Sequence, residues 1–454
     1  MLKLYNSRTK SKEEFIPRED DQVKMYSCGP TVYDYVHIGN LRAFTTEDIL
    51  YRVLKYKGHN VKYIMNITDV GHLTDDADQG KDKMEQGSRR EGKSAEEIAE
   101  FYTKAFKKDV SDLNILPPDK WPIATEHIEE MINLVQKLID KGYTYETSDG
   151  IYFDTTKLDD YGKLANLEEQ DLDPGARVEM KEKKNKHDFA LWKFSPEDKD
   201  RQMEWKAFEK MGFPGWHIEC SAMSMEYLGE QFDIHWGGVD HIPVHHTNEI
   251  AQSEAATSKK PWVNFWMHVE FLQVKDEKMS KSKNNFVTMK DIKNKSIEPL
   301  AFRYFLLQSH YRKELNFTRD ALKAAEKGLK KLRRKTNSLD KNKPGDPKLE
   351  EEFMEAINDD LNTAEALSVL WKGFEQDRIS RNLISKFDKI LGLDLLELKE
   401  KEVKIPEEVQ ELLEMRAEAR EAGNWERSDK LRAEIKAKGY EVRDTEEGQK
   451  VSKK

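Results

Sequence analysis

The chain contains very little cysteine, because only Cys28 and Cys220 occur among its 454 residues. Two cysteines are too few for a disulfide framework and are typical of a protein whose thiols stay reduced. Long apolar runs are also missing, since no run approaches the roughly 18 residues that a membrane-spanning helix requires. The N-terminus turns polar after Leu4, too early for the apolar core of a signal peptide. These absences predict a cytoplasmic protein without a membrane segment.

A net positive charge is missing as well. The chain has 76 Lys and Arg against 86 Asp and Glu, which gives a formal charge of -10. This balance argues against a general nucleic-acid coat protein, because non-specific phosphate binding usually needs a positive excess. Local basic patches remain compatible with the total, and residues 323–343 hold nine Lys or Arg with leucines at helical spacing. This segment is interpreted either as an ordinary solvated helix or as a contact for a polyanion.

Apolar periodicity predicts two segments of a nucleotide-binding sheet. Strands are expected at 22–27 and 61–68 with a glycine turn and a helix between them, and this βαβ pattern predicts a parallel sheet. A second core segment, 205–274, is expected to add a strand at 231–238 and a helix at 244–257. The residues between the two segments are interpreted as an insertion with a helix (Ile128 to Lys141) and a short strand (Ile151 to Phe153). After about Ser309 the pattern is almost purely helical.

The most specific short motif is Lys278-Met279-Ser280-Lys281-Ser282. Two lysines supply point charges and two serines supply hydrogen-bond donors, a combination that suits a polyanion such as a phosphate chain. The alternative interpretation is an exposed basic loop without a ligand.

A second motif, His37-Ile38-Gly39-Asn40, lies where a predicted strand leads into a helix. The N-terminus of a helix presents unpaired N–H groups and the positive end of the helix dipole, and Gly39 lets a ligand approach the backbone. The side chains of His37 and Asn40 add donors, so this turn is predicted to bind phosphate. The alternative is a purely structural histidine.

Together the two motifs resemble the HIGH-type signature and the KMSKS loop of class I aminoacyl-tRNA synthetases. The match is closest to the cysteinyl-tRNA synthetase family and spans nearly the whole chain. The matching segments are CGPTVYDYVHIGNLR (28–42), NITDV (66–70), PGWHIECSAM (214–223), HHTNEIAQSEA (245–255), KMSKS (278–282), NDDLNTAEALSVL (358–370) and NWERSDKLRAEIKAKGYEVRDTEEG (424–448). One departure is Asn40, which stands where the signature has histidine; asparagine can still donate a hydrogen bond.

The residues themselves also predict a metal site. His245 and Glu249 are four apart on a predicted helix and therefore project from one face, and Cys28 follows a strand that should end near the same crevice. Thiolate, imidazole and carboxylate ligands favour zinc over magnesium or calcium. His241 and His246 are alternatives that spacing leaves open, and two unrelated buried cysteines are the ordinary alternative. Both cysteines fall inside the segments that match the family, and on that resemblance the predicted metal ligands are Cys28, Cys220, His245 and Glu249.

The resemblance implies further site residues. It implies one Zn²⁺ per chain, which binds the thiolate of the substrate cysteine and thereby excludes serine. Because four protein ligands usually mark a closed zinc site, the site must become five-coordinate or loosen a ligand, and Glu249 is the candidate for the loose one. It also implies ATP with Mg²⁺ as a substrate, with Asp240 beside the ribose and backbone groups of 269–274 beside the adenine. The expected catalytic residues are His37, Asn40, Lys278 and Lys281. The expected ATP-binding residues are Gly39, Gly238, Asp240, Lys281 and Ser282. The expected amino-acid pocket consists of Gly29, Thr68 and Trp216.

The expected function is that of a cysteine–tRNA ligase, with cysteine, ATP and tRNA(Cys) as partners, and we expect a monomer. The alternatives are a cysteine-activating ligase with an amino-sugar acceptor, as in mycothiol-type ligases, and a non-catalytic RNA-binding paralogue. The expected fold class is α/β, with a Rossmann-type parallel-sheet catalytic domain that carries an insertion, then an α-helical bundle and a small C-terminal domain. The expected boundaries are 1–116 and 205–274 for the two halves of the catalytic domain, 117–204 for the connective insertion, 275–318 for the KMSKS loop and stem-contact region, 319–400 for the tRNA-binding bundle and 401–454 for the anticodon-binding domain.

Overall fold

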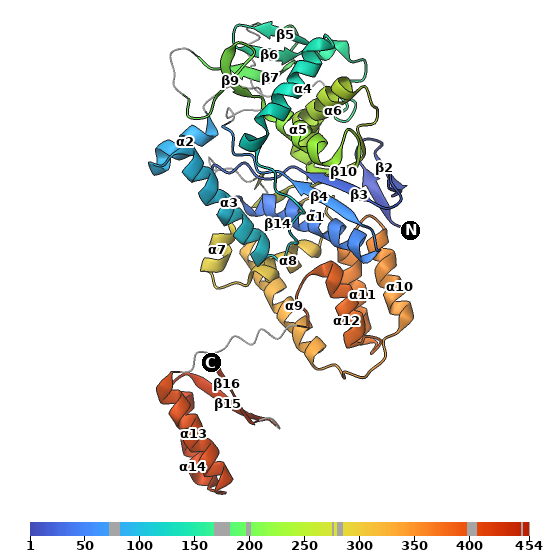
Figure 1. Ribbon diagram of the computed structural model, residues 1–454. Coiled ribbons are helices and arrows are strands. Elements are labelled where there is room, and N and C mark those ends of the chain that lie inside the picture. The colour runs from blue at the N-terminus through green and yellow to red at the C-terminus, as the bar shows by residue number, and fades with distance from the viewer. Residues whose placement is uncertain are drawn as a thin grey trace. The chain divides into compact units, whose positions relative to one another are not determined.

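The computed structural model describes residues 1–71, 82–167, 182–196, 201–274, 277–278, 285–396, 406–445 and 448–453 (Figure 1). The chain divides into two compact units, 1–396 and 397–454. Among the described residues, none of the helices has both the length and the apolar character of a membrane span.

A four-stranded parallel sheet in the first unit confirms the predicted Rossmann-type fold. Its order is β11 (Val263–Val269), β10 (Phe232–Gly238), β3 (Val23–Ser27) and β4 (Val61–Met65). The chain passes from β3 through α1 (Ile38–Tyr56) to β4 on one side, whereas β10 lies on the other side of β3. In open α/β sheets a ligand binds at the carboxyl ends of the strands, at such a reversal of strand order.

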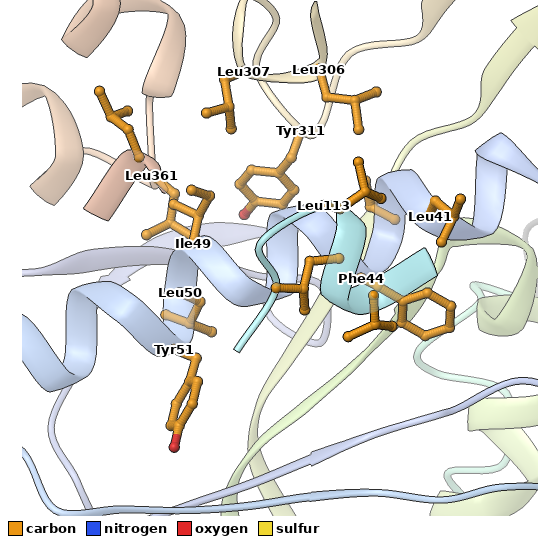
Figure 2. Packing of buried hydrophobic residues seen from close by; sticks show 14 of the residues in the cluster. Leu41, Phe44, Ile49, Leu50, Tyr51, Leu113, Leu306, Leu307, Tyr311 and Leu361 are labelled. Carbon is orange, nitrogen blue, oxygen red and sulfur yellow. The ribbon is translucent and has the colours of Figure 1, made fainter. Parts of the chain in front are cut away.

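Helices cover both faces of this sheet. Figure 1 shows α1 on one side and α5 (Trp216–Leu228) with α6 (Thr247–Thr257) on the other. Successive strand residues point to opposite faces, so Met25 packs in the hydrophobic cluster that contains α1 and Tyr26 in the cluster that contains α5. Figure 2 shows apolar side chains of α1 and their neighbours from the helical part: Leu41, Phe44, Ile49, Leu50, Tyr51, Leu306, Leu307, Tyr311 and Leu361.

The insertion is richer in strands than the sequence predicted. It contains α4 (Ile128–Asp140) and an antiparallel sheet in the order β5 (Thr144–Thr147), β6 (Gly150–Phe153), β7 (Phe189–Phe194), β9 (Lys210–Pro214) and β8 (Trp205–Ala207). The strands β8 and β9 lie beyond the predicted boundary at residue 204, because they pair with β7 and with each other rather than with the parallel sheet. Only α4 and β6 were predicted. The edge strands β5 and β8 are three or four residues long and partly exposed, so they carry no run of apolar residues that a periodicity search detects.

The helical part of the first unit follows the predicted pattern. It comprises α8 (Pro299–Leu307), α9 (Arg319–Asn337), α10 (Pro347–Asn358), α11 (Thr363–Glu375) and α12 (Arg381–Leu391). The buried guanidinium of Arg303 donates to Asp48 of α1 and to the carbonyl groups of Leu391 and Leu113. Asp48 also pairs with Arg52 at 2.7 Å, so α1 is fixed to the bundle by a buried charge network.

The other elements are short or lie in the second unit. The first unit also contains β1 (Lys3–Asn6), β2 (Ser11–Glu14), α2 (Lys83–Glu91), α3 (Ala95–Asp112), β12 (Leu272–Val274), β13 (Glu277–Lys278), α7 (Met289–Asn294) and β14 (Leu315–Phe317). The second unit contains α13 (Glu407–Glu421), α14 (Trp425–Ala437), β15 (Tyr440–Thr445) and β16 (Gly448–Lys453).

Glu47 of α1 gives a prediction about stability and pH. Its buried carboxyl accepts hydrogen bonds from Ser27 Oγ and Tyr63 OH, and burial, followed by the charge of Asp48, raises its pKa from 4.5 to about 8. The folded protein therefore keeps a proton that the unfolded chain releases, so this contribution to stability is complete below the unfolded pKa and is lost as the pH rises through the folded one.

The variant Glu47→Gln imitates the protonated acid and lacks this dependence. We expect the free energy of unfolding of the variant, relative to that of the unaltered chain, to increase with pH by up to about 1.4 kcal/mol per pH unit between about pH 5 and pH 8. Urea unfolding of both proteins across this range measures the difference. A difference that does not change with pH would show that Glu47 is already ionised in the folded protein.

Candidate active site

A cleft of about 380 Å³ lies at the carboxyl ends of the parallel strands. Ser27 ends β3, Gly238 ends β10, and Val269 ends β11, and all three line the cleft. Predicted site residues that line it are Cys28, Gly29, His37, Gly39, Asn40, Thr68, Trp216, Cys220, Gly238, Asp240 and His245. Segments that extend in sequence from Ser27 to Phe286 are thus brought together, as the order of the strands requires.

The predicted KMSKS residues lie almost wholly outside the described part of the chain. Lys278 belongs to β13, where its backbone lies opposite Gln273 of β12. Lys281 and Ser282 lie outside the described residues. Their roles stay predictions.

His37 is the N-cap of α1 and lines the cleft, and it belongs to the turn that was predicted to bind phosphate. Its Nδ1 accepts a hydrogen bond from the backbone N–H of Asn40 at 3.1 Å, and Asn40 Oδ1 accepts one from the backbone N–H of His37 at 3.2 Å. In a neutral ring whose Nδ1 accepts, Nε2 carries the proton and is a donor. The reciprocal pair also explains why asparagine suits this position, since its short side chain closes the capping box.

Four buried side chains form the predicted metal cluster. Cys28 Sγ lies 3.8 Å from Cys220 Sγ and 3.8 Å from Glu249 Oε1. His245 Nε2 lies 3.0 Å from Glu249 Oε1, as the spacing of four predicted. The ligand atoms of Cys28, Cys220, His245 and Glu249 all lie within 4.8 Å of one another.

The donor set and its geometry fit zinc. Two thiolates that share a tetrahedral zinc ion, each at about 2.3 Å, lie about 3.8 Å apart, which is the separation of the two sulfur atoms. The outer atoms of the ligands are held as well, since His245 Nδ1 lies 2.9 Å from His217 Nδ1 and Glu249 Oε2 lies 2.9 Å from His235 Nε2. Such contacts orient metal ligands in known sites.

A second set of ligand atoms overlaps the first. Cys28, His235, His246 and Glu249 also lie within 4.8 Å of one another. His246 was an alternative in the sequence, whereas His235 was missed. The signal for His235 was a single histidine inside the apolar strand β10, where burial of a polar side chain demands a partner. The set with two thiolates suits zinc better, because thiolate is the softer ligand.

The charges in the cluster favour a bound cation. Burial alone raises the pKa of Glu249, but His235 and His245 outweigh it and hold that pKa well below its usual range. Burial likewise acts to lower the pKa of His245, yet Glu249 and Cys220 raise it to about 10. The hydrogen bond from Cys28 lowers the pKa of Cys220 to about 7 against the effect of burial. The buried carboxylate of Glu249 therefore stabilises a positive charge on a neighbouring imidazole. A bound metal ion would supply the positive charge instead.

The predicted amino-acid pocket adjoins this cluster. Trp216 begins α5, and its ring centroid lies 4.5 Å from that of His245. Thr68 Oγ1 donates to the buried Glu219 Oε2 at 2.9 Å and accepts from Asn66 Nδ2 at 3.0 Å. Asn66 and Glu219 were missed, although both lie inside matching segments, and they hold Thr68 in one orientation.

The last two residues of β10, Gly237 and Gly238, allow a close approach of backbone and side chains. A Cβ atom at Gly237 would lie 2.5 Å from the ring of His246, and one at Gly238 would lie 2.4 Å from Asp240 Oδ1. At Gly237 a larger residue would collide with two imidazole rings, those of His246 and His241, whereas at Gly238 only the exposed carboxylate of Asp240 would have to move. Asp240 itself lines the cleft, where the resemblance places the ribose.

Comparisons with known proteins identify the family. A family model described as the class I (C) tRNA synthetase catalytic domain matches residues 14–327, and the Cysteinyl-tRNA ligase anticodon binding domain matches residues 402–451. The chain belongs to the cysteinyl-tRNA synthetase family. It is therefore a class I aminoacyl-tRNA synthetase by descent, and a DALR domain model matches residues 352–374.

Relatives in this family match over the whole length of the chain. Cysteine–tRNA ligase 1 of Burkholderia lata is 48% identical, over 99% of this chain and 96% of its own. Cysteine–tRNA ligase of Treponema denticola is 44% identical, over 98% of each chain. The solved structure of Mycobacterium tuberculosis methionyl-tRNA synthetase with methionyl-adenylate is 15% identical with a TM-score of 0.58, over 82% of this chain and 88% of that one. This last likeness confirms the class I fold.

Proposed function

We propose that this chain is a cysteine–tRNA ligase that forms cysteinyl-adenylate and pyrophosphate from cysteine and ATP, and then transfers cysteine to the 3′ end of tRNA(Cys). The observation that carries the proposal is one cleft that is lined both by Cys28, Cys220 and His245 of the dithiolate cluster and by the capped N-terminus of α1. Such a cleft can take both substrates, because cysteine presents a thiol and ATP presents a phosphate chain. The full-length match to named cysteine–tRNA ligases supports it.

Cys28, Cys220, His245 and Glu249 would hold one Zn²⁺, which supplies a bond to the substrate thiolate. Serine differs from cysteine by oxygen in place of sulfur and would lose a metal–sulfur bond, a larger penalty than the about 1 to 3 kcal/mol of a missing methylene. Glu249 is the ligand that loosens to admit the substrate, because its second oxygen already has His235 as a partner. Trp216 and Thr68 would orient the rest of the amino acid.

The activation step needs no protein nucleophile. The carboxylate of cysteine attacks the α-phosphorus of ATP, and the bond from phosphorus to the pyrophosphate oxygen breaks. His37, Asn40 and the N–H groups of α1 would hold the phosphate oxygens while their charge redistributes, with Lys278, Lys281 and Ser282 as further donors and Mg²⁺ accompanying the nucleotide. Gly39, Gly238 and Asp240 would hold ATP. The contribution of the chain is positioning and charge stabilisation.

The tRNA is the proposed macromolecular partner. Helix α9 exposes Lys323, Lys327, Lys330 and Arg334, a basic face that suits the phosphate backbone. The second unit would bind the anticodon, as its match to an anticodon binding domain suggests. We propose that the protein acts as a monomer in the cytoplasm.

The test is pyrophosphate exchange with cysteine and with serine, before and after removal of zinc. We expect exchange with cysteine alone and its loss on chelation, because serine and the metal-free site both lack the metal–sulfur bond. Readdition of zinc should restore the rate. Exchange that persists after complete zinc removal would exclude the metal from recognition, and no exchange under any condition would favour a non-catalytic paralogue. Consumption of the adenylate only with tRNA separates the ligase from one with an amino-sugar acceptor.

A further inference from the structure

Arg42 ends the matching segment 28–42, and the chemistry proposed above gives it no part. Its side chain is 1% exposed on α1, and burial lowers its pKa to about 10, so it keeps its charge at neutral pH. The guanidinium donates to the backbone carbonyl oxygens of Phe271, His310, Tyr311 and Lys313. These residues belong to two segments of the chain, and Arg42 joins both of them to α1.

The first segment is a wall of the cleft. Residues 269–272 line it, and the carbonyl of Phe271 accepts from Leu315 N as well as from Arg42. The second segment, 310–313, does not line the cleft but supports it. Glu270 N donates to the carbonyl of Tyr311 at 2.9 Å. The ring of Tyr311 packs on that of Trp236, with 5.5 Å between the ring centroids. The position of this wall relative to α1 therefore depends on the guanidinium.

The same anchor reaches the strand of Lys278. Phe271 precedes β12, and in β12 Gln273 lies opposite Lys278 of β13. Helix α1 begins one turn before Arg42, where His37 caps it. One buried side chain thus connects the helix end proposed for phosphate, the wall proposed for adenine and the strand that contains Lys278.

We infer that Arg42 is a positioning residue for ATP, which sets the distance between the N-terminus of α1 and the backbone of 269–272. The inference rests on the proposed function. A nucleotide bridges two rigid elements, so an error in their separation weakens both sets of contacts at once. Only arginine has a fork of five donors that can span carbonyl groups of two segments; the single ammonium of lysine cannot.

The test compares Arg42→Lys with a matched control, Arg303→Lys. Arg303 of α8 is also fully buried and donates to three backbone carbonyl groups, those of Leu391, Leu113 and Asn114. These contacts join α8 to the helical bundle and do not involve the wall of the cleft. Both variants should lose stability. We expect Arg42→Lys alone to raise the KM for ATP about tenfold in pyrophosphate exchange, with the KM for cysteine and the zinc content unchanged. Equal KM values for ATP in the two variants, compared at the same concentration of folded protein, would overturn the inference.

A second measurement needs no variant and covers the case in which Arg42→Lys does not fold. In the unaltered zinc-loaded protein, ATP should slow amide hydrogen exchange in peptides that span 310–315, while peptides of α4 stay unchanged. Slowing confined to residues that line the cleft would contradict the inference. Absence of cysteine-dependent pyrophosphate exchange in the unaltered protein would instead contradict the proposed function. The two failures are thus distinguishable.

Discussion

Replacement of Cys220 by alanine is expected to remove zinc from the purified protein and to lower kcat/KM for cysteine by about a thousandfold or more. Cys220 supplies one of the two thiolates in the cluster, and its sulfur lies 3.8 Å from that of Cys28. The remaining three ligands would bind zinc weakly and with altered charge. Zinc content by atomic absorption and pyrophosphate exchange at varied cysteine concentration measure the two effects.

The matched control is His246→Ala. This variant breaks the overlapping set Cys28, His235, His246 and Glu249 but leaves the dithiolate set complete. We expect it to keep its zinc. In the cobalt-substituted protein, Cys220→Ala should also weaken the thiolate-to-cobalt charge-transfer absorption, because one thiolate is lost. Zinc retained in Cys220→Ala and lost in His246→Ala would assign the metal to the second set.

Replacement of His37 by asparagine is expected to lower kcat of pyrophosphate exchange about 100- to 1,000-fold while the protein stays nearly as stable. His37 has two roles: its Nδ1 caps α1, and its Nε2–H is the donor proposed to meet the phosphate oxygens. Asparagine keeps an acceptor for the N–H of Asn40 but removes the imidazole. The rate of pyrophosphate exchange reports the contact with phosphate, and thermal unfolding reports the capping of α1.

The companion variant Asn40→Ala tests the other half of the capping box. Its side chain no longer accepts from the N–H of His37, and we expect a loss of about 1 kcal/mol in stability together with slower exchange. If His37→Asn and unaltered protein exchange pyrophosphate at equal rates, His37 only caps the helix. In that case the phosphate site consists of backbone donors and the lysines.

Much of this site was predictable because neighbouring residues carry its signals. His245 and Glu249 meet because four residues make about one helical turn, although the structure begins this turn as a π-helical segment, Ile242–His246, before α6. The capping relation between His37 and Asn40 is equally local. The prediction that Cys28 follows a strand that ends near the crevice relied on the rule for open parallel sheets, and Cys28 does follow β3 and line the cleft.

His235, Glu219 and Arg42 were beyond such rules. Each makes its decisive contact with a residue of another element of the fold: His235 with Glu249, Glu219 with Thr68 and Arg42 with Phe271. A sequence pattern shows that a polar residue lies in an apolar stretch, but it does not show which partner satisfies it. The partner is set by strand order and helix packing, and for Glu219 and Arg42 it lies 151 and 229 positions away in the sequence.

The sequence by itself predicted the Rossmann-type parallel sheet, because local periodicity suffices for it, and through short motifs and the family resemblance it predicted the class I fold and four candidate zinc ligands. Only the tertiary structure decided that the four ligand atoms meet within 4.8 Å and that a second set shares Cys28 and Glu249. It alone revealed that Arg42 joins α1 to the wall of the cleft. Buried polar groups must find partners, and the partners available depend on how the whole chain packs.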